Sequence, residues 1–299
     1  MRVNTNLVPD ILADLQQSQM SLNTALQEVS TGKSVTVPSD NPTASAELVQ
    51  NTIESGNVDQ YTQNVSSVLS TVQSADSVLS SVVSSLTKAV SLGTEGANGT
   101  NSAANLQSIA AQVQSILSSV VTAANTSISG SYLFGGTSAT TPYTADPTSP
   151  TGYTYNGNNE VNSVAVGDNT NVQTNLPGSQ IFSNSSNSVL GALSSLVTAL
   201  NSGNSSDVAT ATASVTSAIS FVGQQQVFYG NVETQLNSQE TFLQQDTVSL
   251  ASQQNNLIGV NEATAATELS QAETDNSAAL AAAAKVLPNT LLNYLSPPS

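Results

Sequence analysis

The stretch STGKSVTVPSDNP, residues 30–42, stands between two segments that have helical periodicity. Gly32 suits the left-handed position that follows the end of a helix. Asn41 and Pro42 suit the N-cap and the first position of a new helix. After Pro42 no proline occurs until residue 142, which leaves room for a long helix. The stretch therefore predicts a joint that ends one helix and starts another.

The segment before the joint is predicted to be an amphipathic helix. Its apolar residues recur at three- and four-residue intervals, the heptad pattern of helices that pack along their length. The predicted seam consists of Leu12, Leu15, Leu22, Leu26 and Val29.

The heptad pattern continues after the joint. Residues 43–92 predict a helix roughly 75 Å long, and a break is expected at residues 93–102, GTEGANGTNS. A third helix is expected to follow. The expected seams are Val65, Val68, Val72, Ala75, Leu79, Val82, Leu86 and Ala89, and then Leu106, Ile109, Val113, Ile116, Val120 and Ala123.

The C-terminal half repeats this pattern. A short helix is expected before a break at residues 201–207, NSGNSSD, and a long helix after it. The long helix has a leucine every seven residues, and the segment 222–235 just upstream contains no Lys or Arg. A DNA-binding zipper needs a basic region there, so the leucine row predicts a packing seam. Its members are Leu236, Leu243, Leu250 and Leu257.

Residues 130–182 differ from both halves, because Gly, Pro, Asn, Thr and Tyr dominate them. Short alternating runs separated by turn residues predict a small β-rich domain. The predicted fold is therefore mainly α, a long antiparallel coiled-coil-like rod with a small β-rich insertion at the tip. Its expected parts are a terminal helical pair (1–32 and 258–299), a helical rod (33–130 and 183–257) and an outer β-rich domain (131–182).

The composition excludes several functions. The 299 residues carry a formal net charge of −16, only 8% of them are charged, and there is no His or Cys. Such a chain repels nucleic acid and lacks imidazole and thiolate chemistry. The remaining options are Ser–Lys pairs, carboxylate pairs or a carboxylate metal site. Lys33 and Lys88 are the only plausible partners of a Ser–Lys pair, and abundant Ser produces such pairs by chance. The acids are scattered along the sequence, which indicates solvated faces. We therefore expect no enzyme, no cofactor and no metal.

The sequence also lacks two targeting features. Its first residues have no apolar core of a Sec-type signal peptide. No stretch of the sequence approaches the ~18 apolar residues of a membrane span. If the protein leaves the cell, another export route is expected.

The C-terminal segment combines AALAAAA, residues 278–284, with the apolar run LLNYL, residues 291–295. The run either docks on its own domain or is buried between subunits. The second reading predicts that both terminal segments form an assembly interface. Its predicted residues are Leu12, Leu15, Leu22, Leu26, Val29, Leu280, Leu287, Leu291, Leu292, Tyr294 and Leu295.

Four of these stretches resemble one family, the third of the flagellar hook-associated proteins, found at the hook–filament junction. Residues 30–42 resemble its TGK…PSDDP signature, with Ser34 in place of the usual Arg and Asn41 in place of the second Asp. GSYLFGGTSATTPY (130–143) and VAVGDNTNVQTNLPGSQIF (164–182) resemble its β-domain motifs. LLNYL resembles its C-terminus.

The resemblance implies a flagellin-related structural protein of the bacterial flagellum. It implies type III export, an extracellular location, and a self-assembled ring between a neighbouring hook-associated protein and flagellin. The paired terminal helices would line an inner tube, the helical rod would form the wall, and the β domain would face outward. A cytoplasmic chaperone would guard the C-terminal region before export. Two alternatives stay open, namely a flagellin filament subunit and a non-flagellar coiled-coil scaffold.

Overall fold

The helices and strands of the protein follow one another in the order in which the sequence predicts them. The computed structural model describes residues 7–184 and 188–295, and the side chains of residues 9–184 and 188–285 within them. The described chain is mainly helical, with short two-stranded antiparallel sheets, which confirms the predicted fold class. It divides into two compact units, residues 1–56 with 246–299 and residues 57–245. The predicted three-part division into domains stays a prediction.

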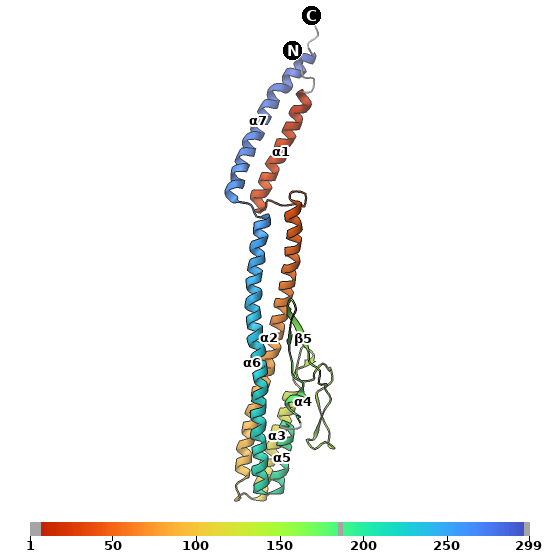
Figure 1. Cartoon of the computed structure of the whole chain (residues 1–299), viewed down its shortest axis with the longest axis vertical. Helices are drawn as coiled ribbons and strands as arrows, with labels where there is room; N and C mark the ends of the chain where they lie inside the picture. Colours follow the sequence, from red (N-terminus) through yellow and green to blue (C-terminus); the bar gives the residue numbers. More distant parts are fainter. Residues whose placement is uncertain (1–6, 185–187, 296–299) are drawn as a thin grey trace. The chain divides into compact units, whose positions relative to one another are not determined.

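Six of the helices pair with one another within these units. In Figure 1, α1 lies beside α7, α2 beside α6 and α3 beside α5. The helices are α1 (Leu7–Thr31), α2 (Pro42–Gly96), α3 (Ala103–Ala124), α4 (Gly178–Ile181), α5 (Val189–Ser202), α6 (Ser205–Ile258) and α7 (Glu262–Leu295).

The joint between α1 and α2 has the predicted capping residues. Gly32 has a left-handed φ of 68°, and its N–H donates to the Glu28 carbonyl at 2.9 Å. The side chain of Asn41 accepts a hydrogen bond from the Ala44 N–H at 3.1 Å, and α2 begins at Pro42. The predicted end of the first helix and start of the second are therefore confirmed.

The break after α2 lies a few residues later than predicted, because α2 continues through Gly93 to Gly96. Both glycines are sites of close packing. A Cβ at Gly93 would collide with the side chain of Thr212 on α6, and a Cβ at Gly96 would collide with Leu200 on α5. These glycines therefore permit close approach of helices, although in sequence they resemble a turn.

The core of the unit formed by residues 57–245 includes the seams that the sequence predicts. Ala123 is half-buried and Ala124 is buried in its place. In the leucine row, Leu257 is half-buried and the other three leucines are buried. The buried members of these seams include Val65, Val72, Leu79, Leu86, Val113, Leu236 and Leu243.

The β-rich insertion consists of three hairpins. Their strands are β1 (Ser127–Ile128), β2 (Ser131–Tyr132), β3 (Tyr143–Ala145), β4 (Tyr153–Tyr155), β5 (Ser163–Gly167) and β6 (Thr170–Gln173). All three pairs are antiparallel.

The predicted position of this insertion at the tip of the helices is wrong. The β5–β6 hairpin lies along the side of α2, where the Asn64 side chain donates to the Ala165 carbonyl at 2.8 Å. The Tyr61 hydroxyl donates to Asp168 at 3.0 Å. The reason is the turn at residues 97–102, after which α3 runs back beside the other helices and carries the insertion away from the end (Figure 1).

Two buried tyrosines anchor the segment after β6. The Leu176 N–H donates to the Tyr229 hydroxyl at 3.2 Å, and the Tyr143 hydroxyl donates to the Gly178 carbonyl at 2.9 Å. Burial raises the pKa of both phenols well above the ordinary value. These hydroxyls therefore stay neutral and serve as structural hydrogen-bonding groups.

The last helix lies within the predicted terminal segment, residues 258–299. The long α6 ends at Ile258, α7 begins at Glu262, and α7 continues past Pro288 to Leu295. A proline removes one backbone donor and disfavours a helix interior, but it does not forbid one when the flanking residues are strong helix formers. The alanine-rich residues 278–284 supply high helix propensity in the turns that precede Pro288.

Candidate assembly surface

The surface predicted for assembly lies on the antiparallel pair of α1 and α7 (Figure 1). The inner face of α1 follows the heptad spacing with mixed large and small residues, whereas the inner face of α7 is mostly alanine. The residues of the α1 face are Ile11, Leu15, Ser18, Leu22 and Ala25. The residues of the α7 face are Ala265, Leu269, Ala272, Asn276, Ala279 and Ala283.

The predicted seam of α1 is therefore only partly right. Leu15 and Leu22 are half-buried on the face toward α7. Leu12, Leu26 and Val29 are exposed by 47%, 45% and 45%, because Ile11, Ala25 and Glu28 next to them turn toward α7 instead. The sequence pattern favoured the largest apolar residues, but an alanine face on α7 packs against smaller ones as well.

The structure leaves an apolar flank on this helical pair, which we define as Leu12, Leu26, Val29 and Leu280. Leu280 on α7 is 48% exposed. Leu12 and Leu26 are two heptads apart and so share one face of α1. About half of each flank side chain stays uncovered within the pair, which makes that half available to a neighbouring molecule.

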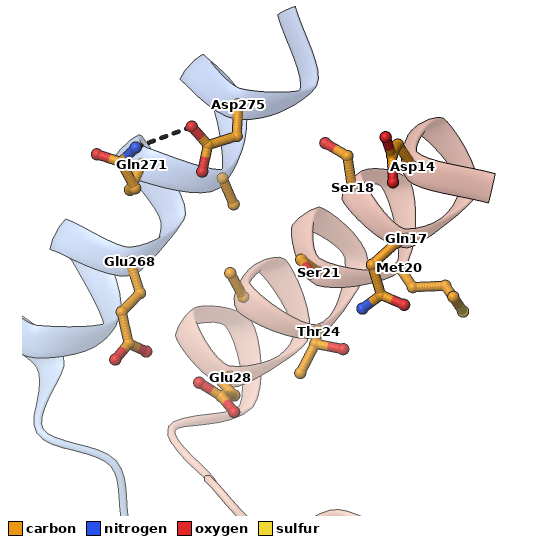
Figure 2. A pocket seen from close by; sticks show the side chains of 12 residues that line it. Asp14, Gln17, Ser18, Met20, Ser21, Thr24, Glu28, Glu268, Gln271 and Asp275 are labelled. Carbon is orange, nitrogen blue, oxygen red and sulfur yellow. Dashed lines mark hydrogen bonds between the residues drawn. The ribbon is translucent and has the colours of Figure 1, made fainter. Parts of the chain in front are cut away.

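An acidic groove of about 600 Å³ runs between α1 and α7 and does not include the apolar flank. Its lining contains the carboxylates of Asp14, Glu28, Glu268 and Asp275 and no Lys or Arg. Figure 2 shows these side chains on the two facing helices, with the Gln271 amide donating to Asp275 at 2.9 Å. The sequence prediction missed this groove, because the acids are far apart in the chain and meet only when the helices pair.

The two segments that connect this pair to α2 and α6 are hydrogen-bonded to each other. Lys33 and Gly259 form an antiparallel β-bridge. The Ser34 N–H donates to the Ile258 carbonyl at 2.7 Å, and the Val260 N–H donates to the Gly32 carbonyl at 3.1 Å. We call this arrangement the linker bridge. It fixes the start of α7 against the end of α1.

Asp40 organises the longer of the two connecting segments. Its carboxylate accepts hydrogen bonds from the N–H groups of Thr36 and Val37, at 3.0 and 2.9 Å, and from the Thr36 hydroxyl at 3.2 Å. The backbone donors, with Val37 first, lower the pKa of Asp40 below its ordinary value. Sequence reasoning assigned Asn41 its capping role and overlooked Asp40.

The last part of the predicted interface lies outside the residues whose side chains are described. Leu287, Leu291, Leu292, Tyr294 and Leu295 all fall in this stretch, although the backbone of α7 extends through it. Their role in assembly stays a prediction.

Other kinds of site find little support in the part of the chain that the structure describes. Within residues 7–184 and 188–295, no three carboxylates gather in a way that could hold a metal ion. No helix in these ranges has the length and apolar character needed to span a bilayer.

Comparison with known proteins gives one match at the level of sequence families. Residues 3–139 match the bacterial flagellin N-terminal helical region. No curated protein sequence matches the chain.

Solved structures with the same fold cover most of the chain. A structure from Vibrio parahaemolyticus, described as a flagellar hook-associated protein, has 20% sequence identity and a TM-score of 0.68, over 74% of this chain and 100% of that one. FlgL from Bacillus cereus has 22% identity and a TM-score of 0.60, over 69% of this chain and 99% of that one. The flagellar junction protein FlgL from Legionella pneumophila has 16% identity and a TM-score of 0.58, over 71% of this chain and 100% of that one. At these identities the likeness shows a shared fold.

Proposed function

We propose that this chain is a structural component of the bacterial flagellum that assembles at the hook–filament junction. The observation that carries the proposal is the match of residues 3–139 to the N-terminal helical region of flagellin. The fold shared with a hook-associated protein and with two FlgL structures supports the junction rather than another flagellar position. A protein with this role works through its contact surfaces, and we propose no enzymatic activity for it.

The pair of α1 and α7 is proposed as the assembly element. Four apolar side chains of its flank remain about half exposed in the single chain. Burying the exposed half of an apolar side chain of this size stabilises a contact by about 1 kcal/mol. The apolar residues predicted near the end of α7 would extend the same surface. The acidic groove is a poor place for a second copy, because like charges would face each other.

The proposed partners follow from this position in the flagellum. Copies of the chain would form a ring, with a neighbouring hook-associated protein on one side and flagellin on the other. A chaperone in the cytoplasm would cover the apolar C-terminal region before type III export delivers the protein to the extracellular flagellum. The chain would connect the hook-associated ring to the filament.

The test replaces apolar flank residues in a strain that lacks its own copy of the gene. Leu12→Asp with Leu26→Asp should give cells that build hooks, release flagellin into the medium and lack filaments. The charges would be buried at the subunit contact, where unpaired charge is costly. Electron microscopy and an immunoblot of the medium provide the readout.

A matched control is Ala13→Asp with Gln27→Asp, which adds the same two charges to α1 at exposed positions outside the flank. This control should form filaments, and circular dichroism should show that both variants keep their helical content. Normal filament number in the Leu12/Leu26 variant would rule out the flank as the assembly surface.

A second candidate function is that of a filament subunit. The flagellin match over residues 3–139 favours it as well, because that region is described for flagellin itself. Immunolabelling of intact flagella separates the two candidates. A single band at the end of the hook supports the junction role, whereas label along the filament supports the subunit role.

A further inference from the structure

The sequence contains two Asn–Gly pairs, Asn98–Gly99 and Asn156–Gly157. In such a pair the backbone nitrogen of Gly can attack the side-chain carbonyl carbon of Asn, because Gly has no Cβ to block the approach and its backbone is unusually free to rotate. The folded chain places the two pairs in different surroundings. One lies in the turn between α2 and α3, and the other lies at the end of the β3–β4 hairpin.

The turn exposes both residues of the first pair. Asn98 and Gly99 lie between the end of α2 at Gly96 and the start of α3 at Ala103. Within the part of the chain that the structure describes, neither the Gly99 N–H nor the Asn98 Nδ2 donates to a protein acceptor. A Cβ built on Gly99 would meet no atom within 4 Å. The attacking nitrogen and the leaving amide are therefore both unrestrained.

Thr100 supplies two donors to the oxygen on which charge would develop. Its N–H and its hydroxyl donate to Asn98 Oδ1 at 3.3 and 3.0 Å. When a nucleophile adds to a carbonyl carbon, negative charge gathers on the carbonyl oxygen, and donors already directed at that oxygen stabilise the transition state. Thr100 therefore favours attack of the Gly99 nitrogen on the side chain of Asn98.

The second Asn–Gly pair is held at several points. The Asn156 N–H donates to the Pro142 carbonyl at 2.7 Å, and the Asn156 Nδ2, the group that would leave, donates to Thr144 Oγ1 at 2.8 Å. A Cβ on Gly157 would collide with the hydroxyl of Tyr155. Attack at Asn156 requires that this end of the hairpin opens first, so the fold protects the second pair.

We infer that Asn98–Gly99 is a site of spontaneous deamidation that Thr100 promotes. The Gly99 nitrogen gives its proton to solvent base and forms a bond to Cγ of Asn98. The bond from Cγ to Nδ2 breaks, and the amide group leaves as ammonia after taking a proton from water. Water then opens the succinimide ring at either carbonyl. The net reaction consumes a water molecule, releases ammonia and converts Asn98 to Asp or isoaspartate.

The conversion would alter the turn that joins α2 to α3. It adds a carboxylate near the C-terminal end of α2, where the helix dipole disfavours negative charge. The Asn98 N–H donates to the Glu95 carbonyl, and the Asn98 carbonyl accepts from the Asn101 N–H, each at 3.2 Å. Isoaspartate lengthens the backbone between these two bonds and disturbs both. The inference does not depend on the proposed flagellar role.

The test follows both pairs in the full chain during incubation in mildly alkaline buffer. Digestion with pepsin at acid pH stops the reaction, because the attacking nitrogen then keeps its proton, and mass spectrometry measures the acid products in each peptide. The rate at each Asn is divided by its rate in urea, where the hairpin no longer protects Asn156.

By this measure Asn98 should react at least about tenfold faster than Asn156, since breaking one or two hydrogen bonds to open the hairpin costs a factor of this order. Such a ratio supports the inference. Equal relative rates in the folded chain, or a faster reaction at Asn156, overturn it.

Two variants test the role of Thr100. Thr100→Val keeps the shape and the N–H but removes the hydroxyl, and it should slow deamidation of Asn98 by about two- to tenfold, the range that an exposed hydrogen bond supplies. Thr100→Ser restores the hydroxyl and should retain most of the rate. An unchanged rate in Thr100→Val, or equal slowing in both variants, overturns the role assigned to Thr100.

Discussion

At the scale of single residues, Asp40 shows how one carboxylate can shape a connecting segment. Its three hydrogen bonds come from Thr36 and Val37, and they favour the charged form. Because the pKa is lowered in the folded chain, the stabilisation is fully present above the unfolded value and is lost as the pH falls through the lower folded value. The amide NMR signals of Thr36 and Val37 should therefore titrate with a midpoint below 3.8, the ordinary value for Asp.

Asp40→Asn provides the control, because it removes the titrating group and should abolish that transition. A midpoint at or above the ordinary value would show that these amides do not donate to the carboxylate in solution.

Tyr229 is the residue whose hydroxyl ties the segment after β6 to α6. Tyr229→Phe should lower the stability of the 57–245 unit by about 1–3 kcal/mol, because the buried Leu176 N–H loses its partner. Urea denaturation measures the change. Tyr132→Phe is the same chemical change at an exposed hydroxyl, which pairs with Thr141 at 3.0 Å, and should have a smaller effect. Equal losses in the two variants would argue against the buried contact.

At the scale of helices, the close approach of α2 and α6 depends on Gly93. Gly93→Ala should destabilise the 57–245 unit by about 1–3 kcal/mol from overpacking against Thr212, partly offset by a gain of about 1 kcal/mol in helix propensity. Thermal unfolding measures the net change, which we expect to be a loss.

Gly223→Ala is the control for this prediction. It also lies inside a long helix, but a Cβ there meets no atom within 4 Å, so the propensity gain should appear alone as higher stability. A second variant, Thr212→Ala together with Gly93→Ala, should recover most of the loss. If Gly93→Ala stabilised the protein as much as Gly223→Ala does, the close contact would be refuted.

A comparison of the helix seams shows which parts of the fold could be predicted from sequence. Seams such as Val65–Leu86 carry a large aliphatic residue at nearly every position, so their heptad pattern is clear. The α1 seam uses Ser18 and Ala25, whose side chains give little hydrophobic signal, and the larger Leu12 and Leu26 beside them misled the prediction. Packing contacts of Gly93 and hydrogen bonds of Asp40 depend on atoms that only the folded chain brings together.

At the scale of the whole chain, the terminal helices should be the first part to be cleaved by a protease. Their pairing buries small side chains, leaves the apolar flank uncovered and contains two unpaired buried oxygens. Opening of the pair costs less than opening the aliphatic seams of α2, α3, α5 and α6. Limited proteolysis of the monomer should trim both ends and leave a stable fragment near residues 35–257.

Mass spectrometry identifies that fragment and its ends. Resistance of both ends in a proven monomer would contradict the expected weakness of the pair. Protection that appears only at high protein concentration would instead agree with burial of the flank between copies.

The linker bridge also has a mechanical consequence. A single connecting strand lets the parts on either side swivel about its backbone bonds, whereas two strands bonded to each other can transmit torque. Here residues 32–34 and 258–260 lie side by side and are hydrogen-bonded to each other, so twisting one strand turns the other. A turning load applied to α1 and α7 would therefore pass into α2 and α6 through both covalent connections rather than being lost in a free swivel.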